Sequence, residues 1–555
     1  MKAQASCRML WAAALCMLAA DSVEAQFREP PPAPAYALQN ATIVDAAGQR
    51  REGMTIVVRS GIIESIGRGT PVPADARVLA GDSLVVYPGL IDAHGKAAHA
   101  LPADSIDRRT VKSWAPTREA IGFRPHRQIA DHLTVTGSGA SAQRRAGIVA
   151  VAVHPTEGLM PGQGALLLLR ADAVAVGSAD MLLEPSLGPV FTLRSRRGFY
   201  PTTGMGTLAW YRQTFLDAAR QTRIAQAASN DARGVGLPAF DRDHAVLQSV
   251  TGGAVPVWFV ANTSSEIRQV LLLSRELELR PVIVGGREAW KLADELKARD
   301  IAVLVSVDFT KPKRWKPESA DSASSEPGVL RERRSIEDEY RNAGRLAQAG
   351  VRFALVSNGG EADLLEGTRK AITYGLSEAA ALQALTITPA TLLGVPALAR
   401  LDVGAPANFL VANGPLFDKD TRVRYTMVAG VPEENQGGAS RARGGAAAEA
   451  VNAAGTWSIE TETPDGNMST TLVLTQDGSN VTGTFRSEFG DAPVNGTING
   501  SELSLTVVLN FGGQQMSIEM KGTIDGEMAS GTVESPMGGA RWTGRRTSPG
   551  MEALR

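Results

Sequence analysis

The stretch Val86-Tyr87-Pro88-Gly89-Leu90-Ile91-Asp92-Ala93-His94-Gly95-Lys96 decides the fold class of this chain. Its apolar run is typical of a strand that is covered on both faces, and the run ends on a carboxylate, an imidazole and an amine. Histidine is scarce elsewhere, because the chain of 555 residues holds only six, at positions 94, 99, 126, 132, 154 and 244. Any chemistry that needs several imidazoles must therefore be assembled from the first half of the sequence.

The composition indicates a globular protein of several domains. Hydrophobic residues make up 43% of the chain, charged residues 21%, and the formal net charge is −1. Such near-neutrality argues against nucleic acid or an anionic membrane as the main partner, since both select strongly basic surfaces. A length of 555 residues predicts about three domains.

The first 25 residues are typical of a secretory signal. Lys2 and Arg8 form a basic start, and an apolar run too short to span a bilayer follows at 9–20. Small residues at 23–25 suit cleavage before Gln26. Both cysteines, Cys7 and Cys16, fall inside this segment, so the mature chain is expected to carry no disulfide. We therefore expect a periplasmic or secreted protein with no membrane span after cleavage.

Two kinds of pattern divide the region from 36 to 431. Short strands separated by glycine turns are expected first, at 36–44, 55–59, 62–66 and 76–80. From 85 to 395, apolar runs alternate with helical stretches, as in a parallel sheet covered by helices. The runs lie at 147–153, 255–260, 281–284, 301–307 and 351–356. One helix is expected at 264–277, opened by Ser264 as a cap.

The end of the chain reads as a separate all-β unit. Residues 432–454 are rich in Gly and Ala and suit a flexible linker. From 455 to 547, alternating strands are punctuated by Asp-Gly and Asn-Gly turns, which predicts an antiparallel meander that closes into a small barrel. This part resembles lipocalin-like β-barrel modules. Trp457 and Trp542 are expected to pack the barrel closed, with a ligand cavity between them as the alternative.

The motif at 88–94 belongs to a set of matches that identifies a family. Further matches are Gly285-Gly286-Arg287-Glu288-Ala289-Trp290, Tyr374-Gly375-Leu376-Ser377, the stretch 388–394 and the stretch 401–410. Together they resemble the amidohydrolase superfamily, in particular its imidazolonepropionase-like branch. The resemblance implies a (β/α)8 TIM-like barrel at 86–397 and a composite β-sandwich built from 36–85 and 398–431. It also implies hydrolysis of carbon–nitrogen bonds other than peptide bonds, with one or two metal ions bound at the carboxyl ends of barrel strands.

Most of the metal site that this resemblance implies is missing. His94 matches the first ligand, but Lys96 stands where the second histidine belongs. Asn262 and Gly285 replace the histidines of the fifth and sixth strands, and Asn358 replaces the aspartate that handles the proton of the water. A divalent metal needs about three protein ligands, so neither a metal nor any other cofactor is expected.

Two side chains leave alternatives open. His154 ends the second strand and His99 follows the first, so a substitute one-metal site with His94, binding zinc, is one alternative to a satisfied or solvated histidine. Lys96 either replaces the lost cation electrostatically, with Asp308 as its partner, or points to solvent.

Two functional hypotheses follow. The first is a pseudoenzyme whose barrel mouth binds a small-molecule ligand or an active paralogue, with His94, Lys96, Asn262, Asp308 and Asn358 as pocket positions. The second is an active amidohydrolase with an atypical one-metal site that uses His94 and His154.

Overall fold

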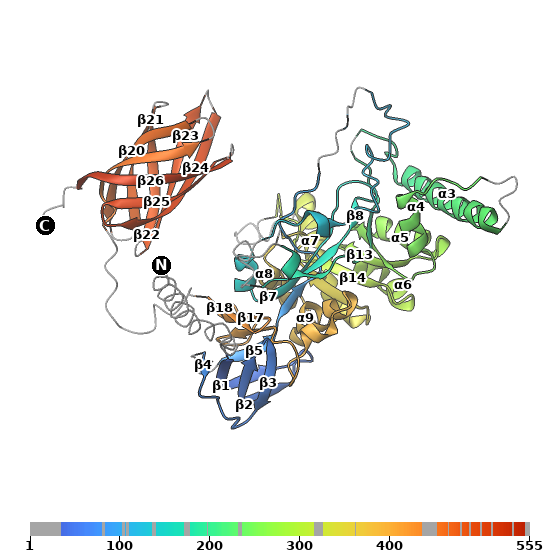
Figure 1. The fold of residues 1–555 in the computed structure, drawn as a ribbon, viewed down its shortest axis with the longest axis horizontal. Coiled ribbons are helices and arrows are strands. Elements are labelled where there is room, and N and C mark those ends of the chain that lie inside the picture. The colour runs from blue at the N-terminus through green and yellow to red at the C-terminus, as the bar shows by residue number, and fades with distance from the viewer. Residues whose placement is uncertain are drawn as a thin grey trace, which may run out of the picture. The chain divides into compact units, whose positions relative to one another are not determined.

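The computed structural model places two compact units along the chain, Met1–Gly438 and Ala439–Arg555 (Figure 1). The residues it describes are 35–79, 84–102, 106, 110–135, 140–170, 178–196, 198–230, 236–315, 326–360, 362–435, 452–463, 466–477, 480–487, 490–499, 502–511, 514–535 and 538–549. The expected signal at 1–25, with Cys7 and Cys16, and most of the expected linker lie outside the described residues. No helix in the described ranges is both long enough and apolar enough to cross a membrane.

An eight-stranded sheet joins the two ends of the first unit. Its strands are β1 (Ala35–Val44), β2 (Arg50–Arg59), β3 (Ile62–Gly67), β4 (Ala76–Val78), β5 (Val85–Pro88), β16 (Phe409–Ala412), β17 (Val423–Val428) and β18 (Val431–Glu434). The order is β18-β17-β16-β5-β1-β2-β3, and β4 pairs with β1. Since β5 and β16 are antiparallel neighbours, the segments before and after the barrel share one core, which includes Ile43, Val86 and Phe409.

Seven parallel strands build most of the barrel wall in the described residues. They are β6 (Leu90–Asp92), β7 (Ile148–Val153), β11 (Pro189–Thr192), β12 (Pro256–Ala261), β13 (Arg280–Gly285), β14 (Ala302–Ser306) and β15 (Phe353–Val356). Each apolar run serves two cores. On β12, for example, Trp258 faces one core and Phe259 faces the other, where it packs with helical residues such as Ile267. This alternation confirms the predicted barrel of strands buried on both faces.

The third strand position of the barrel wall is antiparallel to its two neighbours. Strands β8 (Gly162–Gln163) and β9 (Ala165–Leu168) continue one another, and they pair antiparallel with β11 and β7. Strand β10 (Leu182–Glu184) then pairs antiparallel with β9. Only residues 154–161 separate β7 from β8, and a parallel crossover needs a dozen residues or more. The short connection therefore forces a hairpin where a regular (β/α)8 barrel has a helix.

Helices cover the strands from β11 onward (Figure 1). They are α3 (Gly204–Asn230), α4 (Arg242–Val250), α5 (Ser264–Glu276), α6 (Ala293–Ala298), α7 (Pro327–Gln348), α8 (Leu364–Thr373), α9 (Glu378–Leu385) and α10 (Ile387–Leu392). Helix α5 was predicted, but its N-cap is Thr263 rather than Ser264, because the Glu266 side chain reaches back to complete a capping box. Between β6 and β7, the described residues form only two short helices, η2 (Ile129–His132) and α2 (Ser141–Arg145).

The second unit is a closed antiparallel barrel, as predicted. Its strands are β19 (Gly455–Thr463), β20 (Gly466–Asp477), β21 (Asn480–Ser487), β22 (Gly490–Asn499), β23 (Glu502–Phe511), β24 (Gln514–Asp525), β25 (Met528–Ser535) and β26 (Gly538–Pro549). Trp457 and Trp542 are both 2% exposed within its apolar core, and the Trp457 indole donates to the Ala453 carbonyl at 2.9 Å. Both tryptophans therefore pack the barrel closed.

A side-chain bridge joins the first and last strands of the large barrel. No strand ladder links β6 to β15 among the described residues. Instead the buried Asp92 carboxylate accepts from the backbone N–H of Ser357 at 3.2 Å and from its hydroxyl at 2.5 Å. The His94 N–H also donates to Asp92, at 3.2 Å, and the Gly359 N–H donates to the His94 carbonyl at 2.8 Å. Burial raises the pKa of Asp92, so these donors are what make a carboxylate tolerable there.

We expect Asp92→Ala to lower the free energy of unfolding by about 2–4 kcal/mol, because it leaves three buried donors without their acceptor and opens this bridge. Ser357→Ala removes only the hydroxyl and should cost about 1–2 kcal/mol. Urea unfolding of both variants measures this, with the exposed Asp217→Ala on α3 as control. Equal stability of Asp92→Ala and Asp217→Ala would show that the bridge is dispensable.

Candidate functional site

A cavity of about 840 Å³ lies where the strands of the large barrel end. Its lining comes from the ends of β6, β7, β12, β13 and β15, from the first crossover, from the β7–β8 turn and from the segment after β11. The carboxyl ends of barrel strands are where this architecture places its sites. The lining residues are His94, Gly95, Lys96, Ala97, His99, Leu101, Pro102, Arg127, Val153, His154, Pro155, Thr156, Glu157, Pro161, Arg196, Val260, Asn262, Val284, Gly285, Asn358 and Gly359.

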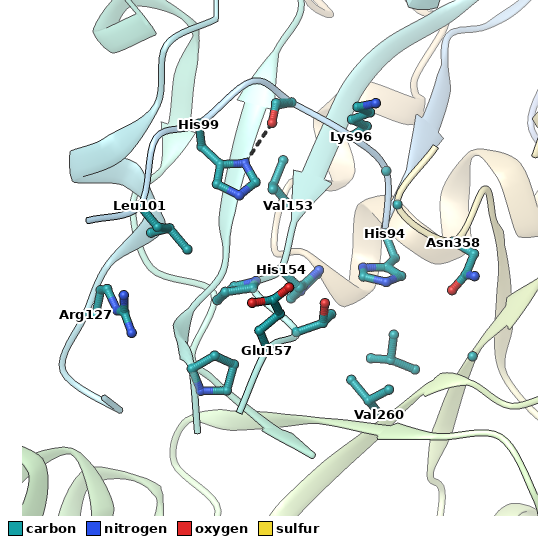
Figure 2. A pocket seen from close by; sticks show the side chains of 18 of the residues that line it. His94, Lys96, His99, Leu101, Arg127, Val153, His154, Glu157, Val260 and Asn358 are labelled. Carbon is teal, nitrogen blue, oxygen red and sulfur yellow. Dashed lines mark hydrogen bonds between the residues drawn. The ribbon is translucent and has the colours of Figure 1, made fainter. Parts of the chain in front are cut away.

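Two buried imidazoles lie side by side in this cavity (Figure 2). His94 follows β6 and His154 follows β7, and their ring centroids are 5.4 Å apart. They are 6% and 5% exposed. Gly164 leaves room for the second ring, because a Cβ at position 164 would lie 2.7 Å from His154 Cδ2. Trp258 also packs against His154, with ring centroids 4.7 Å apart.

Both imidazoles are neutral at neutral pH. Burial lowers the pKa of His94 to about 4. Burial, and secondarily the charge of His94, lowers the pKa of His154 well below its ordinary value. Within the described residues, His94 Nδ1 and both ring nitrogens of His154 have no hydrogen-bond partner. Since a neutral imidazole offers one donor and one acceptor, His154 holds one unsatisfied group of each kind, and both are buried beside the cavity.

Asn262 fills the space that a side chain on the neighbouring strand would need. A Cβ on Gly285 would lie 2.3 Å from Asn262 Oδ1, and Gly285 has φ 97°, a conformation that favours glycine. Asn262 and Gly285 therefore depend on each other: the glycine leaves room for the amide, and Asn262 is the polar side chain at these two strand ends.

Asn358 and Asp308 bind each other. The Asn358 amide donates to Asp308 Oδ2 at 3.1 Å, and Arg287 Nη2 lies 3.0 Å from the same oxygen. Asn358 lines the cavity and Asp308 does not. Arg287, from the turn after β13, thus pairs with the carboxylate that ends the seventh strand, and it also pairs with Glu339 at 2.9 Å.

Lys96 lies exposed in the cavity lining. In the described part of the chain its amine forms no ion pair, and the ion-pair partner of Asp308 is Arg287 rather than Lys96. Of the two alternatives left open for Lys96, the structure favours the exposed side chain over the pairing with Asp308.

A metal centre of the implied kind does not fit these residues. His94 and His154 supply two imidazoles, and no group of three or more His, Cys, Asp or Glu side chains able to hold an ion occurs among the described residues. A structural or catalytic divalent ion ordinarily takes three or more protein ligands.

Sequence reasoning missed three charged residues of the lining, Arg127, Glu157 and Arg196. Figure 2 shows the first two. They lie in the first crossover, in the β7–β8 turn and after β11. Irregular connections have no periodicity that would predict which side chains reach the cavity. The one available signal for Glu157 was its place in the short connection after the second strand, which ends at Val153.

Known proteins were compared with this chain at the levels of sequence and structure. Residues 291–433 match the amidohydrolase family, and this segment includes Asp308 and Asn358 but not His94, His154 or Asn262. No curated protein matches the chain.

Among solved structures, an amidohydrolase from Thermotoga maritima MSB8 is 20% identical, with a TM-score of 0.56, over 72% of this chain and 100% of that chain. Molinate hydrolase is 14% identical, with a TM-score of 0.44, over 72% of this chain and 95% of that chain. The first likeness shows the amidohydrolase fold, which confirms the predicted fold class, and the second adds no argument.

The buried histidines predict how stability depends on pH. Their folded-state pKa values lie below those of the unfolded chain, so their contribution is constant above pH 6.5 and is lost as pH falls towards 4. His94 alone should account for a loss of about 2.5 kcal/mol between pH 7.5 and 4.5. Urea unfolding across this range should show a shallower decline for His94→Gln and His154→Gln than for the exposed control His99→Gln. Parallel curves for all three variants would contradict the assignment.

Proposed function

We propose that this chain, which has the amidohydrolase fold and matches the amidohydrolase family over residues 291–433, binds a small molecule at the barrel mouth without metal-dependent hydrolysis. One observation carries the proposal. The positions that would assemble the metal centre hold Lys96, Asn262, Gly285 and Asn358, yet the cavity they surround persists at about 840 Å³. That volume is in the range of small-molecule sites.

The two strand-end carboxylates near the cavity are engaged within the protein, which leaves Glu157 of the described lining as the carboxylate that could act as a base. Hydrolysis needs a base that takes a proton from water, and such a base must be free to reach it. Asp92 is buried and holds β15 through Ser357, while Asp308 is engaged by Arg287 and Asn358. The two remaining imidazoles and the amides of Asn262 and Asn358 are uncharged groups that recognise a ligand by hydrogen bonds.

A one-metal hydrolase is the second candidate function. The 5.4 Å between the rings of His94 and His154, and their unpartnered nitrogens, favour it. Zinc accepts neutral imidazoles, and a bound zinc ion would supply a water of lowered pKa. The pair would hold the ion only with a further donor beyond the two imidazoles, which is why this function ranks second.

We also propose an exported protein, located in the periplasm or outside the cell. The basic start, apolar run and small residues of the first 25 positions support this location. In that compartment an active paralogue is the alternative partner of the barrel mouth.

Metal analysis separates the two candidate functions. We expect the protein purified from zinc-supplemented medium to carry close to no zinc per chain, and to release no product from N-acetyl amino acids or cyclic imides. About one zinc per chain, lost in His154→Gln and kept in His99→Gln, together with chelator-sensitive turnover, would favour the hydrolase instead.

A further inference from the structure

We propose that Asp308 is a positioning residue that sets what the barrel-mouth cavity accepts. It turns the amide oxygen of Asn358 into the cavity, so the ligand carries an N–H or O–H group at that place. This inference rests on the proposed binding function and names a chemical feature of its ligand. It is carried by the hydrogen bond between the two side chains, by the contacts that hold Asp308, and by the accessibility of the amide oxygen.

The hydrogen bond between Asn358 and Asp308 fixes which end of the amide meets the cavity. Asn358 Nδ2 donates to Asp308 Oδ2 at 3.1 Å. A carboxylate only accepts hydrogen bonds, whereas an amide has a donor end and an acceptor end. Because its NH2 group is bound to Asp308, Asn358 offers its oxygen to the cavity that it lines, and Figure 2 shows this oxygen directed towards the cavity.

Asp308 is itself held in one orientation. Arg287 Nη2 lies 3.0 Å from the same oxygen, Oδ2, and the Asp308 N–H donates to Ser306 Oγ at 3.1 Å. Arg287 pairs with Glu339 of α7 at 2.9 Å, and Glu339 also accepts from the Thr310 N–H at 3.0 Å. The contacts that fix the Asn358 amide therefore begin on a helix outside the cavity lining.

The Asn358 oxygen is accessible to a ligand. It accepts no hydrogen bond from the described residues, and it is not fully buried, unlike the ring nitrogens of His154. An acceptor that reaches the cavity without a partner is satisfied by a donor on the ligand. A carbonyl or carboxylate oxygen at the same place would be repelled by it.

The backbone narrows the choice of side chain at position 358. Asn358 has φ 59°, a left-handed conformation that glycine, asparagine and aspartate adopt most readily. Glycine would offer no polar group, and aspartate would place a second carboxylate against Asp308. Of these three residues, only asparagine can donate to Asp308 and accept from a ligand at once.

Apolar side chains of the lining determine the body of a suitable probe. Val260 and Val284 lie on the neighbouring strands β12 and β13, and Leu101, Pro155 and Pro161 come from irregular connections. A flat apolar molecule with a single donor suits such a lining, because small-molecule sites are mostly apolar with a few placed polar groups.

The test compares probes of nearly equal shape that differ in one donor: indole with benzofuran, and phenol with fluorobenzene. Ligand-observed NMR titration of the full chain, with a chelator present, should show tighter binding of indole and of phenol. We expect about a three- to tenfold ratio within each pair, the usual contribution of one hydrogen bond. The pair with the larger ratio distinguishes an N–H ligand from an O–H ligand.

Variants locate the effect in Asp308. Asp308→Ala removes the acceptor, so the Asn358 amide can turn and the ratio should fall below about twofold. Asp308→Asn keeps the shape but can donate as well as accept, and should also lower the ratio. A merely structural role would weaken both members of a pair equally and leave the ratio unchanged.

Asp300→Ala is the matched control. Asp300 precedes the strand β14 that Asp308 follows, pairs with Arg352 at 2.8 Å, and does not line the cavity. This variant should keep the ratio of the unaltered protein. Urea unfolding establishes that each variant is folded before it is titrated.

Three outcomes would overturn the proposal: equal binding within both pairs, a ratio that neither substitution of Asp308 lowers, or no binding of any probe at millimolar concentration. Each leaves the proposed binding function standing, because that function fails only if metal analysis and turnover reveal a hydrolase. The two failures are therefore distinguishable.

Discussion

The link between Asp92 and Ser357 is the constraint on which the large barrel depends. It connects the first strand to the last across a seam that has no strand ladder in the described residues. The same carboxylate accepts the backbone N–H of His94, so the seam also orients one wall of the cavity. A buried carboxylate is costly unless its lone pairs are occupied, and three donors occupy them here. The Asp92 side chain thus both closes the barrel and positions His94 in the cavity.

The substitutions around the cavity form coherent arrangements. Asn262 occupies the space beside Gly285, and Asn358 donates to an aspartate that also pairs with Arg287. The first pairing depends on the small size of Gly285, and the second leaves the Asn358 amide hydrogen-bonded. His154 differs, since both its ring nitrogens are buried and have no hydrogen-bond partner in the described ranges.

Much of the fold was predictable from sequence. The apolar runs at 147–153, 281–284 and 351–356 lie within two residues of β7, β13 and β15, because continuous buried strands leave a clear pattern. The antiparallel direction of β8 and β9 was not predicted, since a short apolar run does not indicate the direction of its strand. Only the short connection at 154–161 indicates it.

The site was predictable where it lies on strand ends. His94, Asn262 and Asn358 all line the cavity, as strand-end positions should. Asp308 ends a strand too, but Arg287, in a turn remote in sequence, binds its carboxylate. Arg127 and Arg196 lie in irregular segments, whose course depends on tertiary contacts that no local pattern records.

The antiparallel direction of β8 and β9 limits which residues can line the mouth of this barrel. A strand delivers side chains to the mouth from its carboxyl end only if it runs outward, and the segment 162–168 runs inward. Its last residues therefore lie at the far end of the wall, whatever their identity. Point substitution can change the side chains at positions 96, 262 and 358, whereas a side chain at 285 would also require a smaller residue at 262. Strands β8 and β9 cannot supply side chains to the mouth from their carboxyl end, because they run in the opposite direction. Only a longer connection before Gly162 would allow a parallel strand at this position.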